Sequence, residues 1–193
     1  MRPRIEPVLL SVLSDLDRGL RELGVPFAIV GALVPELLPE EGVVFNMAGF
    51  AHAVPHAVPT VIDGGPTLPL VPLPLYALLK LVAFSDRKAA KDLGGVLHCL
   101  EHYLEDDDRR YGVEYGAEGV PYEYTCAHLL GLDGRMFLDD ALVAAVRAVL
   151  ERFDEPDAAV VGIAAGERGR LVEDDQRLQV FELFRWYRLG LSL

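Results

Sequence analysis

The chain has 193 residues, of which 51% are hydrophobic, and it carries a formal net charge of −12. This length and composition indicate one domain, or one domain with a small appendage, and enough apolar residues for a packed core. The acidic charge excludes a broad nucleic-acid-binding surface, which needs a basic face, but it is compatible with a local basic patch.

Neither the cysteines nor the hydropathy pattern points to an exported or membrane protein. Cys99 and Cys126 have no CxxC spacing, so we expect both to be reduced and buried. The apolar run near the start of the chain lacks the cleavage region of a signal peptide. The apolar run over residues 68–84 contains three prolines and Lys80, which makes it a poor membrane span. We therefore expect a cytoplasmic protein with no membrane partner.

The first part of the chain mixes helix and strand signals. Residues 5–24 have helical periodicity and end at Gly24, a natural helix stop. The short apolar run VPFAIV, residues 25–30, predicts a buried strand because it is partly β-branched. Gly31 follows it, and residues 32–38 look like the start of a second helix.

A hairpin and then a series of helices follow. Residues 43–58 mix a strand with irregular structure, and the run TVIDGGPTLPLV predicts a β-hairpin around Asp63 and Gly64. The acidic, glycine-containing residues 106–122 indicate a loop. Helical patterns cover residues 74–93, 96–105, 123–130, 139–153 and 174–189. This order indicates the α+β or α/β class. We expect a small mixed sheet flanked by helices in residues 1–75 and a mainly helical part in residues 76–193.

The three lysines of the chain, Lys80, Lys88 and Lys91, lie within one short segment. In a continuous helix Arg87 and Lys91 would project within about 20° of Lys80, and the leucines would project to the opposite side. This pattern is typical of an amphipathic helix with a solvated basic stripe. It also fits a phosphate-binding site, which we call the phosphate grip. A lysine ammonium is a compact point charge and an arginine guanidinium is a planar fork, so the two are not equivalent at a phosphate. The spacing alone does not decide between these two interpretations. Because nearly all the other cationic residues of the chain are arginines, the grouping of the lysines in this segment favours the phosphate grip.

Two segments, VPFAIVGAL and VPLPLYALLKLVAFSDRKAAKDLGGVL, resemble the minimal nucleotidyltransferase superfamily, and most closely the AbiEii-type toxins and their uncharacterised relatives. The resemblance covers roughly residues 5–105. Residues 27–32 match a strand that runs into a glycine turn. The later helix motif matches at Lys80, Asp86, Arg87, Lys91 and Asp92.

The resemblance implies a nucleotidyltransferase-like fold and a reaction. Such proteins transfer a nucleoside monophosphate from a nucleoside triphosphate with Mg²⁺ to an acceptor, here an RNA end or a protein hydroxyl, and an antitoxin is an implied partner. By the same resemblance, the expected nucleotide-binding residues are Gly31 in the turn, Lys80, Arg87 and Lys91 at the triphosphate, and Asp92 as the partner that orients them.

The catalytic carboxylates of that family are missing from the expected place. No Asp-x-Asp occurs within residues 31–75, where Asp63 is the one aspartate and belongs to the predicted hairpin turn. Gly95 also stands where the family typically has an aspartate. Compared with relatives, a segment is absent between Leu38 and Val43. Three explanations are open: omitted chain, a real deletion that leaves a non-catalytic nucleotide- or partner-binding remnant, or a misleading resemblance.

A different chemistry is suggested by His98, Glu101 and His102, which match the H-x-x-E-H pattern of inverted zinc peptidases. Two histidines four positions apart on a helix can share a zinc ion, with Glu173 or Glu182 as a third ligand. The alternative is that both histidines extend the basic stripe.

Aromatic and basic residues alternate near the end of the chain. Phe181, Phe184, Trp186 and Tyr187 lie among arginines over residues 177–188. Such a pattern can stack nucleobases. It also suits a closing helix that caps the core, which we favour.

Overall fold

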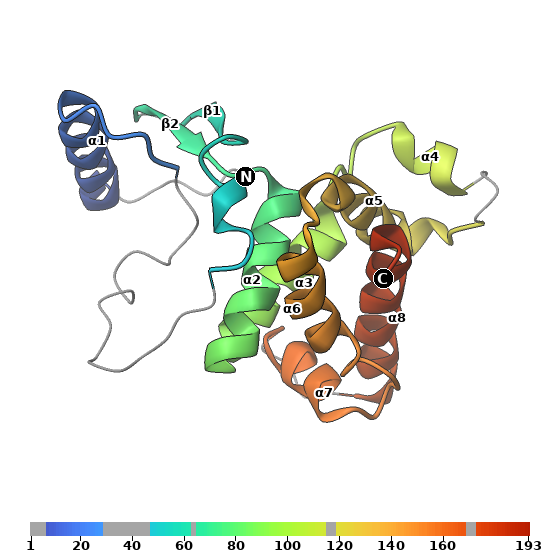
Figure 1. Cartoon of the computed structure of the whole chain (residues 1–193). Coiled ribbons are helices and arrows are strands. Elements are labelled where there is room, and N and C mark those ends of the chain that lie inside the picture. The colour runs from blue at the N-terminus through green and yellow to red at the C-terminus, as the bar shows by residue number, and fades with distance from the viewer. Residues whose placement is uncertain (1–6, 29–46, 63–64, 115–118, 169–172) are drawn as a thin grey trace. The chain divides into compact units, whose positions relative to one another are not determined.

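The computed structural model describes residues 7–28, 47–62, 65–114, 119–168 and 173–193 (Figure 1). The chain divides into two compact units. The first comprises Met1–Val43 and Phe50–Pro72, and the second comprises Val44–Gly49 and Leu73–Leu193. Among the helices described, none has the length and apolar character needed to cross a membrane.

The first unit contains a helix and a hairpin. Helix α1 spans Pro7–Glu22, and Gly24 ends it with a left-handed φ of 64°, as the sequence predicts. Strands β1 (Val58–Val61) and β2 (Thr67–Leu70) pair antiparallel, with Val58 opposite Leu70. The hairpin predicted around residues 63–64 is therefore confirmed by the pairing of its arms, although the two turn residues lie outside the described part.

The strand predicted over residues 25–30 is wrong for its described part. Residues 25–28 belong to no strand. Pro26 has no N–H to donate to a ladder, and this segment instead lines a pocket together with hairpin residues such as Pro59 and Leu68. Gly31, the helix predicted over residues 32–38 and the strand portion before Met47 fall outside the described residues. From Met47 to β1 the chain forms turns and a short 3₁₀ helix, Phe50–His52.

The second unit is helical. Its helices are α2 (Leu73–Arg87), α3 (Ala90–His102), α4 (Arg109–Glu114), α5 (Thr125–Gly134), α6 (Asp140–Leu150), α7 (Ala159–Gly166) and α8 (Asp174–Leu191). Helix α2 packs on α3 and α6, and α8 packs along α5 and α7 (Figure 1). Buried leucines of α2, α3 and α5, together with Phe84, Phe184 and Tyr187, form the core. Cys99 and Cys126 are free and buried, as predicted.

The continuous helix predicted over residues 74–93 is wrong, because the chain breaks between α2 and α3. Lys88 adopts a left-handed φ of 54°, which a right-handed helix cannot accommodate. Helix α3 then begins at Ala90 and continues through Gly94 and Gly95. A Cβ on Gly95 would lie 2.8 Å from the hydroxyl of Tyr76, so close packing of α2 on α3 explains this glycine.

The longer helices of the second half of the chain were predicted from the sequence, whereas the short helices were not. The helices predicted over residues 123–130, 139–153 and 174–189 are confirmed as α5, α6 and α8, with shifted ends. Helix α4 lies within the segment predicted as a loop, and α7 was not predicted. At the coarse level the described fold is helix-rich α+β with a small two-stranded antiparallel sheet.

Helices α5 and α8 cross at two glycines. A Cβ on Gly131 would lie 2.4 Å from the main-chain oxygen of Tyr187, and one on Gly190 would lie 2.3 Å from that of His128. Both distances are far inside van der Waals contact, so the two backbones can approach this closely only because neither residue has a side chain.

Candidate functional site

The candidate site is a cluster of three charged residues at the break between α2 and α3. The carboxylate of Asp92 accepts a hydrogen bond from Lys80 Nζ at 2.9 Å and from Arg87 Nε and Nη2 at 2.7 Å each. Helix α2 carries Lys80 and Arg87 two turns apart, and the first turn of α3 carries Asp92. We call these three residues the Asp92 cluster.

Burial distinguishes the Asp92 cluster from a surface ion pair. Asp92 is fully buried, Lys80 is 6% exposed and the Arg87 side chain is 27% exposed. Burial by itself would raise the pKa of Asp92, but hydrogen bonds and positive charge from Arg87 and Lys80 outweigh it, so the pKa is lowered. The carboxylate is therefore ionised, and it faces two cations with one negative charge.

Tyr76 and Gly95 form the wall beside Lys80. The Lys80 ammonium lies 5.7 Å from the centroid of the Tyr76 ring. Burial raises the pKa of Tyr76, with smaller contributions from Cys99 and Asp92, so the phenol stays neutral. Tyr76 thus adds an aromatic face but no charge beside the Lys80 ammonium.

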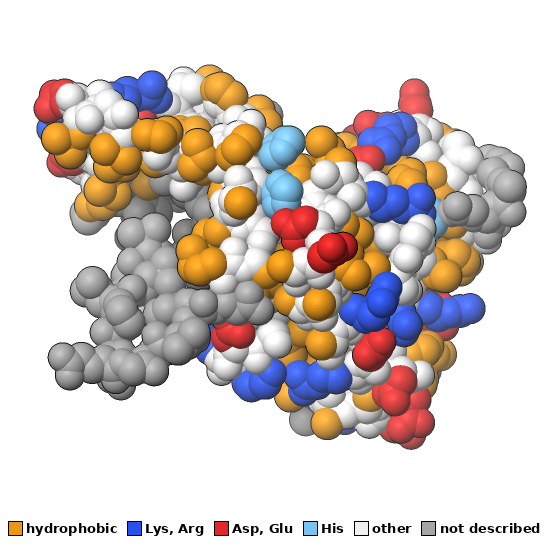
Figure 2. All heavy atoms as spheres, viewed as in Figure 1, with side chains coloured by type: hydrophobic (Ala, Val, Ile, Leu, Met, Phe, Trp, Pro, Cys, Tyr) orange, Lys and Arg blue, Asp and Glu red, His pale blue; other side chains and the backbone are white. Residues whose placement is uncertain are grey.

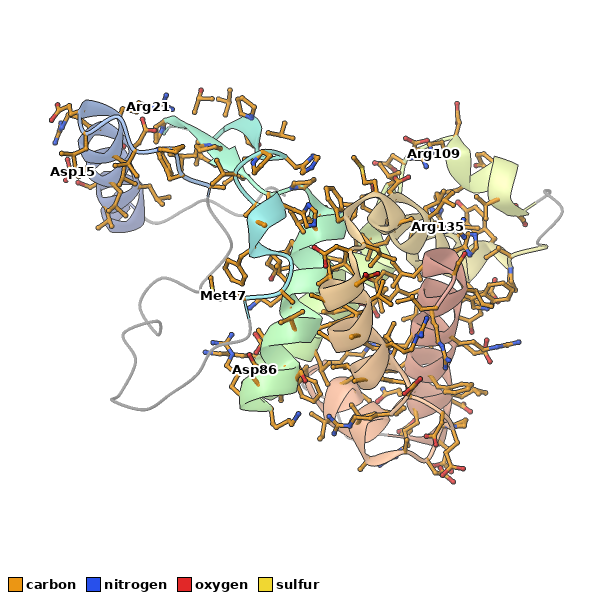
Figure 3. All side chains as sticks on the ribbon, viewed as in Figure 1. Asp15, Arg21, Met47, Asp86, Arg109 and Arg135 are labelled. Atoms are coloured by element: carbon orange, nitrogen blue, oxygen red, sulfur yellow. The ribbon has the colours of Figure 1, made fainter. Side chains whose placement is uncertain are left out.

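Further cations surround the break on the surface. Lys88 Nζ lies 5.9 Å and the guanidinium carbon of Arg152 lies 5.4 Å from the centroid of the Phe84 ring. Lys88 also donates to the main-chain oxygen of Ser85. On the face shown in Figure 2, Lys and Arg side chains gather near the C-terminal end of α2, where Figure 3 labels Asp86. We call residues 87–91 the elbow.

The start of α3 adds partial positive charge to the elbow. Ala89 is the N-cap residue and its side chain makes no capping hydrogen bond. The Asp92 amide donates to the main-chain oxygen of Ala89 at 3.0 Å, and the first turn of a helix carries the positive end of its dipole. Lys91 is exposed in this first turn, so backbone and side chain both favour an anion here.

The structure brings together three of the five site residues that the resemblance implies. Lys80, Arg87 and Asp92 form the cluster, and Lys91 lies exposed next to Asp92. Gly31 falls outside the described residues, as does the proposed gap between Leu38 and Val43. The interpretation as a solvated basic stripe is wrong for Lys80, because the chain turns back at the elbow and Asp92 of α3 meets its ammonium.

Sequence reasoning missed Arg152. This residue follows α6 and approaches the elbow only through tertiary packing against Phe84. A lone arginine just after an amphipathic helix gives no signal of such a contact, so no sequence pattern could have found it.

The charged residues described here do not fit the Mg²⁺ that the resemblance implies. The described part of the chain has no group of three His, Cys, Asp or Glu residues placed to hold a metal ion. Both oxygens of Asp92 already accept hydrogen bonds from Lys80 and Arg87. A cation would therefore compete with an ammonium and a guanidinium for the same carboxylate.

The predicted zinc pattern is likewise not assembled in the described residues. The rings of His98 and His102 lie 4.8 Å apart on α3, but Glu101 is paired with Arg168. Glu182, one suggested third ligand, is paired with Arg185 of its own helix at 2.9 Å.

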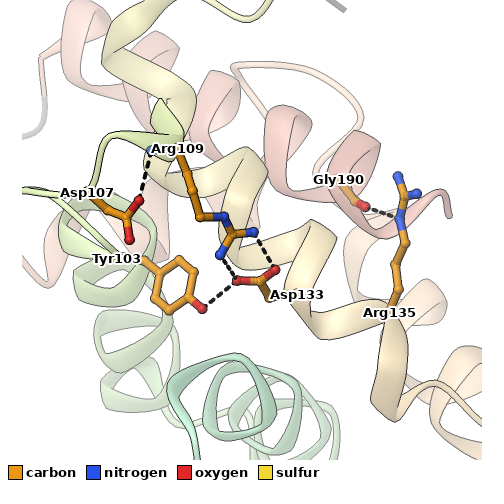
Figure 4. Close-up of polar contacts among 6 residues, drawn as sticks. All are labelled: Tyr103, Asp107, Arg109, Asp133, Arg135 and Gly190. Carbon is orange, nitrogen blue, oxygen red and sulfur yellow. Dashed lines mark hydrogen bonds and ion pairs between the residues drawn. The ribbon is translucent and has the colours of Figure 1, made fainter. Parts of the chain in front are cut away.

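A second carboxylate with two donors provides a contrast. Asp133 of α5 accepts from Tyr103 Oη at 2.7 Å and from Arg109 Nη1 and Nη2 at 2.8 and 2.7 Å (Figure 4). The Arg109 hydrogen bonds lower the pKa of Asp133 against the effect of burial. Burial, followed by the Asp133 hydrogen bond, raises the pKa of Tyr103. These three residues, the Asp133 cluster, therefore carry one positive and one negative charge.

Comparison of the chain with family models, curated proteins and solved structures found no match.

Proposed function

We propose that the chain binds the phosphates of a nucleoside triphosphate at the elbow between α2 and α3. The observation that carries this proposal is the convergence of two cations, Lys80 and Arg87, on the single carboxylate of Asp92 at the break between two helices. Charge-assisted hydrogen bonds from an ammonium or a guanidinium to phosphate oxygens are strong, and they are screened less where the cations are partly buried than on an open surface.

Asp92 prepares its partners for such a ligand. Two hydrogen bonds from Arg87 hold the guanidinium plane in one orientation. Lys80 has three donors on its ammonium, and its hydrogen bond to Asp92 uses one of them. Phosphate oxygens are strong acceptors, and a side chain that is already fixed loses little freedom when it binds them.

The surface around the cluster favours a compact polyanion. Lys88, Lys91 and Arg152 add positive charge around the elbow, where Asp86 contributes one negative charge, and the first turn of α3 adds the positive end of its helix dipole. The chain as a whole carries −12, which repels an extended nucleic acid, whereas a triphosphate is small enough to touch the elbow alone.

The proposal is for binding without nucleotidyl transfer. Transfer in the family that the sequence resembles requires carboxylates that hold Mg²⁺, and residues 31–75 contain no Asp-x-Asp. The function is thus that of a nucleotidyltransferase-like protein which retains the phosphate grip. An RNA or protein acceptor and an antitoxin partner remain implications of the resemblance.

The test is a titration with ATP and with inorganic tripolyphosphate, by calorimetry. We expect both to bind and each to displace the other. Lys91→Gln and Arg87→Gln should each weaken binding about tenfold, since each removes a charge-assisted contact. Arg147→Gln, on the exposed face of α6, is the matched control and should bind as the wild type does.

Two outcomes would overturn the proposal in different ways. If neither anion binds, or if Lys91→Gln binds unchanged, the elbow is not the phosphate site. If α-labelled ATP with Mg²⁺ transfers its label to RNA or protein, the binding-only conclusion fails and catalysis must be assigned. Circular dichroism of each variant establishes that it is folded.

A further inference from the structure

The surface at α4 carries two exposed tyrosines that lie against each other. Tyr111 of α4 is 52% exposed, and Tyr122, which begins the short 3₁₀ helix before α5, is 41% exposed. Their ring centroids lie 5.9 Å apart with planes at 27°, which is a stacked arrangement. Within the residues that the structure describes, every other Phe, Tyr and Trp side chain is buried or half-buried. The two exposed aromatic rings are thus gathered in one place on the surface.

Arg110 holds this tyrosine pair in place. Its side chain is buried, and its guanidinium carbon lies 4.1 Å from the centroid of the Tyr122 ring. The guanidinium donates to Thr125 Oγ1 at 2.8 Å and to the main-chain oxygens of Glu105 and Tyr122 at 2.8 and 3.2 Å. A ring that is fixed before a partner arrives loses little freedom on binding. Because Arg110 already contacts the Tyr122 ring, Tyr111 is the ring that can accept a further cation.

Carboxylates outnumber cations on the surface around the pair. Arg109 is already paired with Asp133 (Figure 4). Tyr122 makes the largest contribution to raising the pKa of Tyr111, and the negative charge of Asp108 raises it further, so that carboxylate lies near the phenol. The acidic residues within residues 105–114 and 119–124 are Glu105, Asp106, Asp107, Asp108, Glu114 and Glu123, against Arg109 and Arg110.

We propose that this surface binds an arginine-containing basic segment of a partner protein, with a guanidinium stacked on Tyr111 and paired with Asp108. A guanidinium is planar, so it can lie flat on an aromatic ring and also donate two hydrogen bonds to a carboxylate. A lysine ammonium supplies the charge but not the plane. Exposed tyrosines and complementary charge are both typical of protein interfaces. This surface attracts cations, so it goes beyond the phosphate binding at the elbow and does not depend on it.

The experiment uses the full chain and three peptides: tetra-arginine, tetra-lysine and tetra-citrulline, in which the guanidinium is replaced by a neutral group of the same shape. Calorimetry should show that tetra-arginine binds about tenfold more tightly than tetra-citrulline, because only the former is charged. It should bind about threefold more tightly than tetra-lysine, because only a guanidinium both stacks and pairs. Amide resonances of Asp108, Tyr111 and Tyr122 should shift in the NMR spectrum during the titration.

Variants separate the ring from the charge. Tyr111→Leu should remove most of the preference for arginine over lysine, and Tyr111→Phe should retain it. Asp108→Asn should weaken both charged peptides about threefold, whereas the matched control Glu155→Gln, in the turn before α7, should leave both affinities unchanged. Circular dichroism establishes that each variant is folded.

Two outcomes would overturn the proposal. Equal binding of tetra-arginine and tetra-lysine to the wild-type chain would show that no ring takes part, and this comparison needs no variant. Equal losses in Asp108→Asn and Glu155→Gln would show that the peptides follow the overall charge of −12 and not this surface.

Discussion

The Asp92 and Asp133 clusters are built from the same parts and differ in charge balance. Each has one carboxylate that accepts hydrogen bonds from two side chains. Around Asp92 both donors are cations and the carboxylate is fully buried. Around Asp133 one donor is the neutral phenol of Tyr103, and Asp133 is 26% exposed. The second cluster pairs one cation with one carboxylate and joins helices, whereas in the first two cations share one carboxylate, which is the arrangement that the proposed phosphate binding uses.

The largest expected effect comes from removing the buried carboxylate. Asp92→Ala removes the buried carboxylate that pairs with both Lys80 and Arg87, so we expect the free energy of unfolding to fall by about 3–5 kcal/mol. Urea unfolding measures it. Glu155→Ala, an exposed carboxylate in the turn before α7, should change stability by less than about 0.5 kcal/mol. A loss at Asp92 as small as that would show that the cluster contributes little to the fold.

The next effect is steric and involves neither cluster. Gly190→Ala places a methyl group against the main-chain oxygen of His128 and should cost about 1–3 kcal/mol in unfolding free energy. Phosphate binding at the elbow should not change, which separates lost stability from lost function. Gly112→Ala, in α4 with open space around it, should instead stabilise by about 0.5–1 kcal/mol. Equal effects of the two substitutions would argue against the close crossing of α5 and α8.

A smaller loss is expected at the balanced cluster. Asp133→Asn keeps the shape of the side chain but removes the charge that Arg109 meets, and Arg109 is 45% exposed. Solvent screens such a pair, so unfolding free energy should fall by about 0.5–1.5 kcal/mol. Calorimetric titration with tripolyphosphate should give the wild-type affinity. Weaker phosphate binding in this variant would contradict the division of roles between the clusters.

Acid should act on Asp92 in a defined direction. Its pKa is lowered in the folded protein, so its ionised form stabilises the fold above the ordinary aspartate value of about 3.9. This contribution is lost as the pH falls from that value through the lowered pKa. The stability gap between the wild type and Asp92→Asn should therefore shrink below about pH 4 in urea unfolding experiments. A gap that stays constant or widens would contradict the lowered pKa.

The longer elements and part of the site could be predicted from the sequence, because the signals for them lie in residues that are close together along the chain. Gly24 ends α1, and the periodicity of α8 is visible over its whole length. The break at Lys88 was not predictable, because a non-glycine residue in the left-handed region carries no sequence signal. Helix α7 is short and apolar on all sides, so it shows no amphipathic period.

The site shows the same division between local and tertiary information. The motif spacing selected Lys80, Arg87 and Asp92, but their convergence follows from α3 folding back on α2. The burial of Lys80 and the approach of Arg152 to Phe84 are tertiary facts with no counterpart in spacing. Gly31 lies outside the described residues, so its predicted role stays a prediction.

The most direct test of the central claim is an NMR titration of the full chain with inorganic tripolyphosphate. The proposed phosphate site at the elbow predicts that the largest amide shifts fall on residues 87–92, and that Lys91→Gln reduces them together with the affinity. Shifts that concentrate elsewhere, for example at Arg185 and Arg188, or the absence of shifts in a folded protein, would contradict the account.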